Sequence, residues 1–282
     1  MRPVTSLLLG IAVACLCTMG AVADDAPPMA GTAELAKEIP RGFLKGYLET
    51  EQLPDSVALL PPPPPVGSAA QRLDEEVARE TLALRGTPRW KVAALDAALP
   101  DGKAADAFSC ALGVPINATD TPHTLLLLRR VLTDAGRATG AAKKKYFQAR
   151  PFMIDYSPIC TPDDQERLRQ DGSYPSGHTS IGWAWALTLA EADPDQARAL
   201  MQRGFQFGES RLVCNVHWDS DVIEGRTIGA ATFARLNTNP DFQRDHALAR
   251  DEIVAVRAKG LPPSRDCAAE AEALAATPYL GP

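Results

Sequence analysis

The sequence predicts an all-α fold, and three observations support this prediction. Apolar residues recur at helical spacing in segment after segment, whereas sustained alternation of apolar and polar residues is rare. Prolines stand where several of these segments begin or end. The chain has 282 residues, of which 45% are hydrophobic and 23% are charged, so it can bury a sizeable core as an ordinary globular protein.

The expected helices follow one another through the middle of the chain. Residues 24–58 show no clear pattern, and the run from Pro61 to Pro65 predicts an extended polyproline segment. This segment could link two domains, but we expect it to pack along the surface because no separate core precedes it. Thr121-Pro122 predicts a helix start and Pro151 a helix stop. Helices are expected over residues 72–84, 125–135, 134–150, 180–192, 194–207 and 221–236.

Residues 1–23 have the pattern of a secretory signal peptide. Arg2 supplies a positive charge, residues 4–14 are apolar, and Ala21-Val22-Ala23 offers small residues at a cleavage site. The apolar run is short for a spanning helix, which disfavours a membrane anchor. We therefore expect cleavage after Ala23, export to the periplasm and a single domain over residues 24–282.

The remaining chain argues against several kinds of partner. The net charge of the full chain is -6, which provides no basic surface for a nucleic-acid backbone. No later segment has about 18 consecutive apolar residues, so no membrane partner is expected. Four cysteines remain after cleavage: Cys110, Cys160, Cys214 and Cys267. In an oxidising compartment they predict two disulfides with three alternative pairings, and buried free thiols are the competing interpretation.

A first cluster of chemistry-bearing residues is Lys143 with Arg150-Pro151. The two cations are seven residues apart, which is two turns of a helix, so both could lie on one face. Two cations on one face can bind a dianion, and the planar guanidinium matches phosphate oxygens. Taken alone, the pair is more typical of a solvated helix face.

A second cluster, Ser176-Gly177-His178, precedes an apolar helix. Backbone N–H groups at a helix N-terminus favour an anion, and Gly177 allows a close approach. The Ser176 hydroxyl could donate to the anion, and His178 would stand beside it with a proton to give. Alone, this motif is more often a simple helix cap.

A third cluster consists of Ser210-Arg211, His217 and Asp221. A carboxylate that accepts from one ring nitrogen of His217 would fix the tautomer and leave the other nitrogen free as a nucleophile. Arg211 would hold phosphate for the attack. A buried structural pair is the alternative for His217 and Asp221 considered alone.

Together the clusters read Lys-x6-Arg-Pro, Pro-Ser-Gly-His and Ser-Arg-x5-His-x3-Asp, in that order. This pattern resembles the signature of the bacterial class A non-specific acid phosphatases, within the type 2 phosphatidic acid phosphatase and vanadium haloperoxidase superfamily. The resemblance extends to the proline run with Gly67-Ser68 and to residues 172–189, and it covers about residues 59–240.

The resemblance implies a role for each residue of the signature. His217 would attack phosphorus, Asp221 would orient His217, and His178 would protonate the leaving alcohol and then activate water. The phosphate oxygens would be bound by Lys143, Arg150, Ser176, Gly177 and Arg211. The resemblance further implies a compact helical fold, small phosphate monoesters as substrates with a broad range, and inhibition by phosphate or vanadate. It leaves a homodimer open.

No metal and no cofactor are expected, because the sequence has no cluster of Asp, Glu and His with metal-ligand spacing. Since Arg150, Arg211 and His217 would converge on one phosphate, the resemblance also favours a Cys160–Cys214 disulfide, which leaves Cys110 with Cys267.

Other functions remain open at this point. A vanadium haloperoxidase could use the same pocket, because vanadate resembles the transition state of phosphate transfer. A phosphotransferase would pass the phosphate to an alcohol instead of water. A membrane lipid phosphatase is disfavoured by the lack of internal apolar spans, and an exported phosphate-binding protein would not need His178, His217 and Asp221 together.

Overall fold

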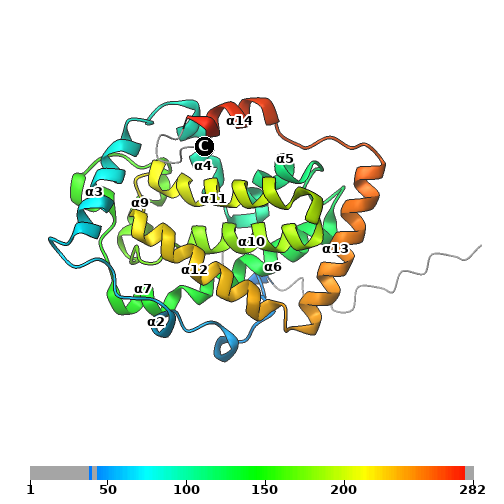
Figure 1. The fold of residues 1–282 in the computed structure, drawn as a ribbon, viewed down its shortest axis with the longest axis horizontal. Helices are drawn as coiled ribbons and strands as arrows, with labels where there is room; N and C mark the ends of the chain where they lie inside the picture. The colour runs from blue at the N-terminus through cyan, green and yellow to red at the C-terminus, as the bar shows by residue number, and fades with distance from the viewer. Residues whose placement is uncertain (1–37, 40–42, 277–282) are drawn as a thin grey trace, which may run out of the picture.

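A computed structural model describes residues 38–39 and 43–276, and helices make up most of this part of the chain (Figure 1). The predicted all-α fold is confirmed. The predicted signal peptide, residues 1–23, lies outside the described residues. None of the described helices combines the length and apolar character needed to cross a membrane.

The α-helices are α2 (Ser56–Leu59), α3 (Ala69–Leu82), α4 (Pro88–Asp96), α5 (Ser109–Leu112), α6 (Pro122–Ala138), α7 (Gly140–Tyr146), α8 (Pro151–Asp155), α9 (Gln165–Arg169), α10 (Gly177–Ala192), α11 (Ala197–Val213), α12 (Asp219–Leu236), α13 (Pro240–Ala258) and α14 (Cys267–Ala275). Short 3₁₀ segments lie at Thr50–Gln52, Pro100–Phe108, Pro162–Asp164 and Pro194–Gln196. A two-residue antiparallel pair, β1 (Glu38–Ile39) with β2 (Phe43–Leu44), precedes them and was not predicted.

The centre of the molecule is α10, which packs against α11, α12 and α6. Figure 1 shows α10, α11 and α12 running side by side. Two glycines of α12 permit the close approach: a Cβ on Gly229 would lie 2.5 Å from the Ser180 carbonyl oxygen, and one on Gly225 would lie 2.7 Å from that of Ser176. Any larger residue would push α12 away from the start of α10, so these glycines set the spacing of the helices that carry the site.

Aromatic side chains fill the main core beside α10. Trp185 is fully buried, and its ring packs against Phe207 and Phe108 at centroid distances of 5.8 Å and 6.1 Å. The indole N–H of Trp185 donates to the Leu128 carbonyl over 2.7 Å, which satisfies its one polar atom. The core therefore ties α10 to both α11 and α6.

The expected features at the helix boundaries are present in part, since Pro151, which was predicted as a helix stop, is instead the first residue of α8. α6 begins at Pro122, as predicted, and α10 begins three residues before the predicted Ser180. Residues 61–65 form neither helix nor strand, and the Tyr174 hydroxyl donates to the Pro61 carbonyl over 2.7 Å. The proline segment therefore packs against the helical body at this point.

The prediction of one helix over residues 134–150 is wrong. α6 ends at Ala138, α7 ends at Tyr146, and Phe147 has a φ of 42°. Arg150 is extended, with φ -81° and ψ 155°, because the ring of Pro151 disfavours the helical conformation in the residue before it. Lys143 and Arg150 therefore do not share a helix face.

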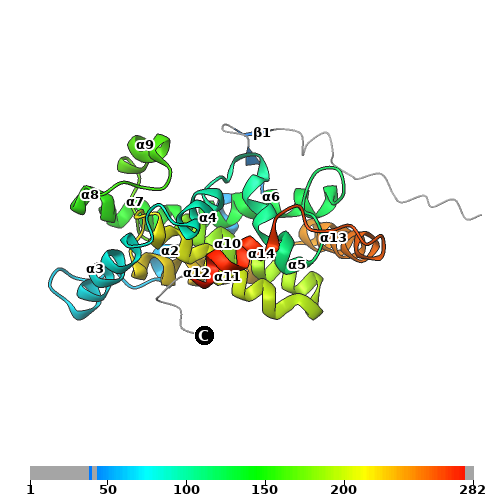
Figure 2. The same ribbon diagram turned by 90° about the horizontal axis from the view of Figure 1, so that it is seen from above.

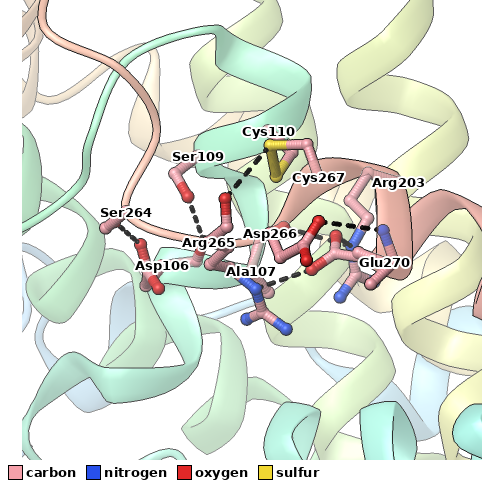
Figure 3. Close-up of a disulfide and its surroundings, with 11 residues drawn as sticks. Asp106, Ala107, Ser109, Cys110, Arg203, Ser264, Arg265, Asp266, Cys267 and Glu270 are labelled. Atoms are coloured by element: carbon pink, nitrogen blue, oxygen red, sulfur yellow. Dashed lines mark hydrogen bonds and ion pairs between the residues drawn. A yellow bond between two sulfur atoms is a disulfide. The ribbon is translucent and has the colours of Figure 1, made fainter.

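Both favoured disulfides are confirmed, Cys110–Cys267 and Cys160–Cys214. The first joins α5 to the start of α14, next to the ion pairs that Glu270 forms with Arg203 and Arg265 (Figure 3). The disulfide fixes α14, the last described helix, to α5, and the ion pair of Glu270 with Arg203 links α14 to α11.

Candidate active site

The candidate site lies at the end of the molecule where α7, α8 and α9 group together (Figure 2). The start of α10 and the connection from α11 to α12 reach the same end (Figure 1). There the backbone N–H of Ser176 donates to the Asp221 carbonyl over 2.9 Å. The second and third sequence clusters are thus in direct contact.

The Arg150 guanidinium connects the first cluster to the third. It is 1% exposed, and its Nη1 lies 2.9 Å from the Val216 carbonyl and 3.1 Å from Nε2 of His217. The ammonium of Lys143, on the last turn of α7, contacts the carbonyls of Gly172 and Ser173. Both cations thus reach the segment just before α10, although they come from different elements.

His217 is held between a cation and a carboxylate. It lies in the loop before α12, where its Nδ1 is 3.1 Å from Oδ2 of Asp221. Because Arg150 can only donate, Nε2 of His217 accepts, so the proton of the neutral ring is on Nδ1 and is donated to Asp221. The lone pair of Nε2 therefore lies on the side of the cations.

Asp221 is fully buried and accepts from several donors. Its Oδ2 also accepts the Trp218 N–H over 2.9 Å, and its Oδ1 lies 3.4 Å from the Ser173 hydroxyl. Burial raises the pKa of Asp221 to about 7, while the Trp218 N–H and the charge of Lys143 oppose this shift. Burial and the Arg150 charge lower the pKa of His217 well below its usual range. His217 is therefore neutral in mildly acidic solution.

Ser176 and Gly177 form the start of α10, as predicted. Ser176 is the cap residue, and its Oγ accepts the Thr179 N–H over 3.3 Å. A Cβ on Gly177 would lie 3.8 Å from Cε of Lys143. The positive end of the helix α10 thus adjoins the Lys143 side chain.

His178 follows on the first turn of α10 and contacts α4. Its Nε2 lies 3.2 Å from the carbonyl of Ala97, just after the last residue of α4. A carbonyl only accepts, so Nε2 carries the proton of the neutral ring and the ring lone pair is on Nδ1. Burial and the charge of Arg211 lower the pKa of His178 well below its usual range.

Arg211 is a buried cation with an unsatisfied donor. Its side chain is on α11 and is 1% exposed, and its Nε has no hydrogen-bond partner among the described residues. Burial and the charge of Arg150 lower the pKa of Arg211 to about 9. Burial likewise lowers the pKa of Lys143 to about 8. An anion beside these groups would oppose both shifts and satisfy the free donor.

Several contacts of the site were not predicted from sequence. Asp171, which immediately precedes the Gly172–Leu189 run, is near both Lys143 and Arg150. The indole of Trp218 donates to the Ala149 carbonyl over 2.8 Å and holds the segment before Arg150. The position of Asp171 directly before the motif could have indicated its part in the site. The contact of the Ala97 carbonyl could not have been found in this way, because every residue has a backbone carbonyl.

The assembled groups could bind and transfer a tetrahedral anion. Three cations and a helix start provide positive charge, and two histidines provide a nucleophile and a proton donor. The described residues contain no group of three or more His, Cys, Asp or Glu side chains placed to hold a metal ion.

Comparison with known proteins gives a consistent result. Residues 124–243 match the PAP2 superfamily. The chain is 46% identical over 220 residues to a non-specific acid phosphatase of Salmonella typhimurium, covering 78% of this chain and 88% of the relative. It is 43% identical over 212 residues to one of Providencia stuartii, covering 75% and 86%. An acid phosphatase of Zymomonas mobilis is 41% identical over 203 residues, covering 72% and 77%. The chain, with its three-part signature, therefore belongs to the PAP2 superfamily and, within it, to the class A non-specific acid phosphatases.

Proposed function

We propose that this acid phosphatase hydrolyses phosphate monoesters through a phosphohistidine formed on Nε2 of His217. The proposal rests on the two ring contacts of His217. Because Nδ1 donates to Asp221, Nε2 presents a lone pair, and that lone pair lies beside the Arg150 guanidinium. An oriented nitrogen nucleophile next to phosphate-binding cations is the arrangement that covalent phosphoryl transfer requires.

In the first displacement, Nε2 of His217 attacks phosphorus as the bond from phosphorus to the ester oxygen breaks. Lys143, Arg150 and Arg211 offset the charge on the other phosphate oxygens, and the start of α10 at Gly177 adds backbone N–H groups. Because Arg150 and Arg211 are buried, their interaction with the phosphoryl group is stronger than it would be in water.

His178 supplies the proton that the leaving oxygen needs. Nε2 is held by the Ala97 carbonyl, so the transferable proton is on Nδ1 when the ring is protonated. Without bound substrate, the His178 ring is neutral, since burial and the charge of Arg211 lower its pKa. A bound phosphate dianion offsets the Arg211 charge and raises the His178 pKa, so the ring takes up its proton together with the substrate.

The second displacement reverses these roles. Neutral His178 accepts a proton from water, and the water oxygen attacks the phosphohistidine. The bond from phosphorus to Nε2 of His217 breaks, which releases inorganic phosphate and restores the neutral ring. The site residues that carry out these two steps contact only the phosphoryl group and the leaving oxygen. This supports a broad range of small esters as substrates.

Export to the periplasm is part of the same proposal. The N-terminal sequence pattern supports it, as do two disulfides, which persist in oxidising compartments. N-terminal sequencing of the protein recovered from a periplasmic fraction should begin at Asp24.

The mechanism is tested by trapping the covalent intermediate. Rapid mixing with a ³²P-labelled monoester, followed by an alkaline quench that preserves phosphohistidine, should label wild-type protein on His217. His217→Ala should lose both the label and turnover, whereas His123→Ala, a control outside the site, should keep both. Activity of the wild type should survive excess chelator. A label that persists in His217→Ala, or activity that requires added metal, would refute the mechanism.

A further inference from the structure

The carboxylate of Asp171 lies between two of the cations of the site. Its Oδ2 is 3.1 Å from Nη2 of Arg150 and 3.4 Å from Nζ of Lys143. One oxygen therefore contacts both cations, as a phosphate oxygen bound between them would.

The protein itself engages every N–H group of Arg150. Nε contacts the carbonyls of Leu168 and Asp171, and Nη1 contacts the Val216 carbonyl and Nε2 of His217. Nη2 contacts the Asp171 carboxylate and the Gly172 carbonyl. A guanidinium has five such donors, so a phosphate can bind Arg150 only by displacing one of these partners.

Lys143 is engaged in the same way. Its ammonium has three donors and three partners, namely the Gly172 carbonyl, the Ser173 carbonyl and the Asp171 carboxylate. Two of these partners are backbone groups of the segment before α10. Arg211 differs from both, because its buried Nε has no partner among the described residues.

Among these partners, the Asp171 carboxylate is the one that can leave at low cost. The side chain of Asp171 is 47% exposed, so it can turn into water and stay solvated. The backbone around it is fixed, because the Asp171 carbonyl accepts from Arg150 and a Cβ on Gly172 would lie 2.8 Å from the Lys143 carbonyl oxygen. Rotation of one side chain would therefore free a donor on each cation.

We propose that Asp171 is an internal competitor of the phosphoryl group for Lys143 and Arg150, and that it limits the affinity of the site for substrate and for inorganic phosphate. This inference rests on the proposed function. Substrate binding must break two contacts of Asp171 and bring a second negative charge near its carboxylate. The same carboxylate returns to the cations after hydrolysis, which weakens the hold on phosphate and promotes product release.

The test is the variant Asp171→Asn, which keeps the shape of the side chain and removes its charge. Binding of inorganic phosphate, measured by titration calorimetry, should become tighter by roughly two- to tenfold, since partly exposed ion pairs contribute modestly. KM for p-nitrophenyl phosphate should fall with it. Added salt should narrow the difference from wild type because it screens the carboxylate.

Two controls separate this effect from a general change of charge or fold. Asp163→Asn removes an exposed negative charge from the same stretch of chain and should bind phosphate as the wild type does. Asp171→Glu keeps the charge and should stay close to the wild type. Thermal unfolding checks that each variant is folded.

The outcomes also separate the inference from the function on which it rests. If wild type binds phosphate and hydrolyses the ester but Asp171→Asn binds phosphate equally or more weakly, Asp171 holds the cations in place and the inference is wrong. If wild-type protein neither binds phosphate nor hydrolyses the ester, the proposed function fails and the inference fails with it.

Discussion

His217 and His178 lie near the same arginines, yet their hydrogen-bond partners give them different chemistry. His217 donates from Nδ1 to a carboxylate, which would stabilise positive charge on the ring in the proposed attack on phosphorus. His178 donates from Nε2 to a neutral carbonyl, which fixes its orientation without adding negative charge. The first arrangement suits a nucleophile and the second suits a group that gains and loses a proton.

The His178→Ala variant tests this division of roles. Without a proton donor, the rate of hydrolysis of an alkyl phosphate should fall toward the upper end of the roughly 10²–10⁴-fold range of general acid catalysis. The rate with p-nitrophenyl phosphate should fall distinctly less, because nitrophenolate leaves without a proton. The comparison uses burst-phase rates, since the same residue also acts in the second displacement. Equal losses for both esters would mean that His178 is not the leaving-group acid.

The sequence predicted the residues of the site better than their surroundings. The spacing of His217 and Asp221 predicted their contact, and Ser176 caps α10 as expected. Asp171 was missed although it directly precedes the Gly172–Leu189 run. Ala97 was missed because a contact made by a backbone carbonyl leaves no pattern in the sequence.

At the level of elements, the site combines residues on helices with residues in the connections between them. Lys143 is in the last turn of α7, Arg150 precedes α8, and His217 lies between α11 and α12. Periodicity predicted α3, α6, α10, α11 and α12, but it missed α4, α13 and α14. It also missed the break after Tyr146, because Ala and Lys favour helix up to that residue. The same limit explains the unpredicted pairing of β1 with β2, since two residues show no periodicity.

The two disulfides should differ in their effect on activity. Cys160–Cys214 joins the chain after α8 to the connection that carries His217, so Cys160→Ser with Cys214→Ser should lower both kcat and thermal stability. Cys110→Ser with Cys267→Ser releases α14 and should lower stability by about 2–5 kcal/mol while kcat stays near wild type. Denaturant unfolding and steady-state kinetics on both pairs check this. A larger loss of kcat from the second pair would contradict it.

At the scale of the whole molecule, buried acids make stability depend on pH. Burial raises the pKa of Asp134 to about 6 and that of Glu209 to about 7. At pH values between the usual pKa of each acid and its raised pKa, the folded state binds more protons than the unfolded state. Stability therefore rises as the pH falls from 8 toward 5. His217 and His178 act oppositely below pH 6.5, because the unfolded state then binds more protons.

The melting temperature should therefore be higher near pH 6 than at pH 8, and it should fall again at lower pH. Thermal unfolding across pH 4–8 measures this. Glu209→Gln removes one of the titrating acids and should flatten the rise between pH 8 and pH 6. A melting temperature that increases steadily toward pH 8 would contradict the assignment.

The unsatisfied Nε of Arg211 places stability and function in opposition. Folding removes this cation from water and provides no partner for Nε among the described residues, so the native state is less stable than its packing alone would make it. In the proposed mechanism, phosphate would supply the missing partner and would stabilise the folded state by about 2.7 kcal/mol at a concentration 100 times its Kd. Arg211→Met should melt at a higher temperature than wild type in phosphate-free buffer, yet gain nothing from added phosphate and show no turnover. A lower melting temperature for Arg211→Met would mean that the cation stabilises the fold by itself. This trade-off makes the native state most stable where phosphate, the product of the enzyme, accumulates.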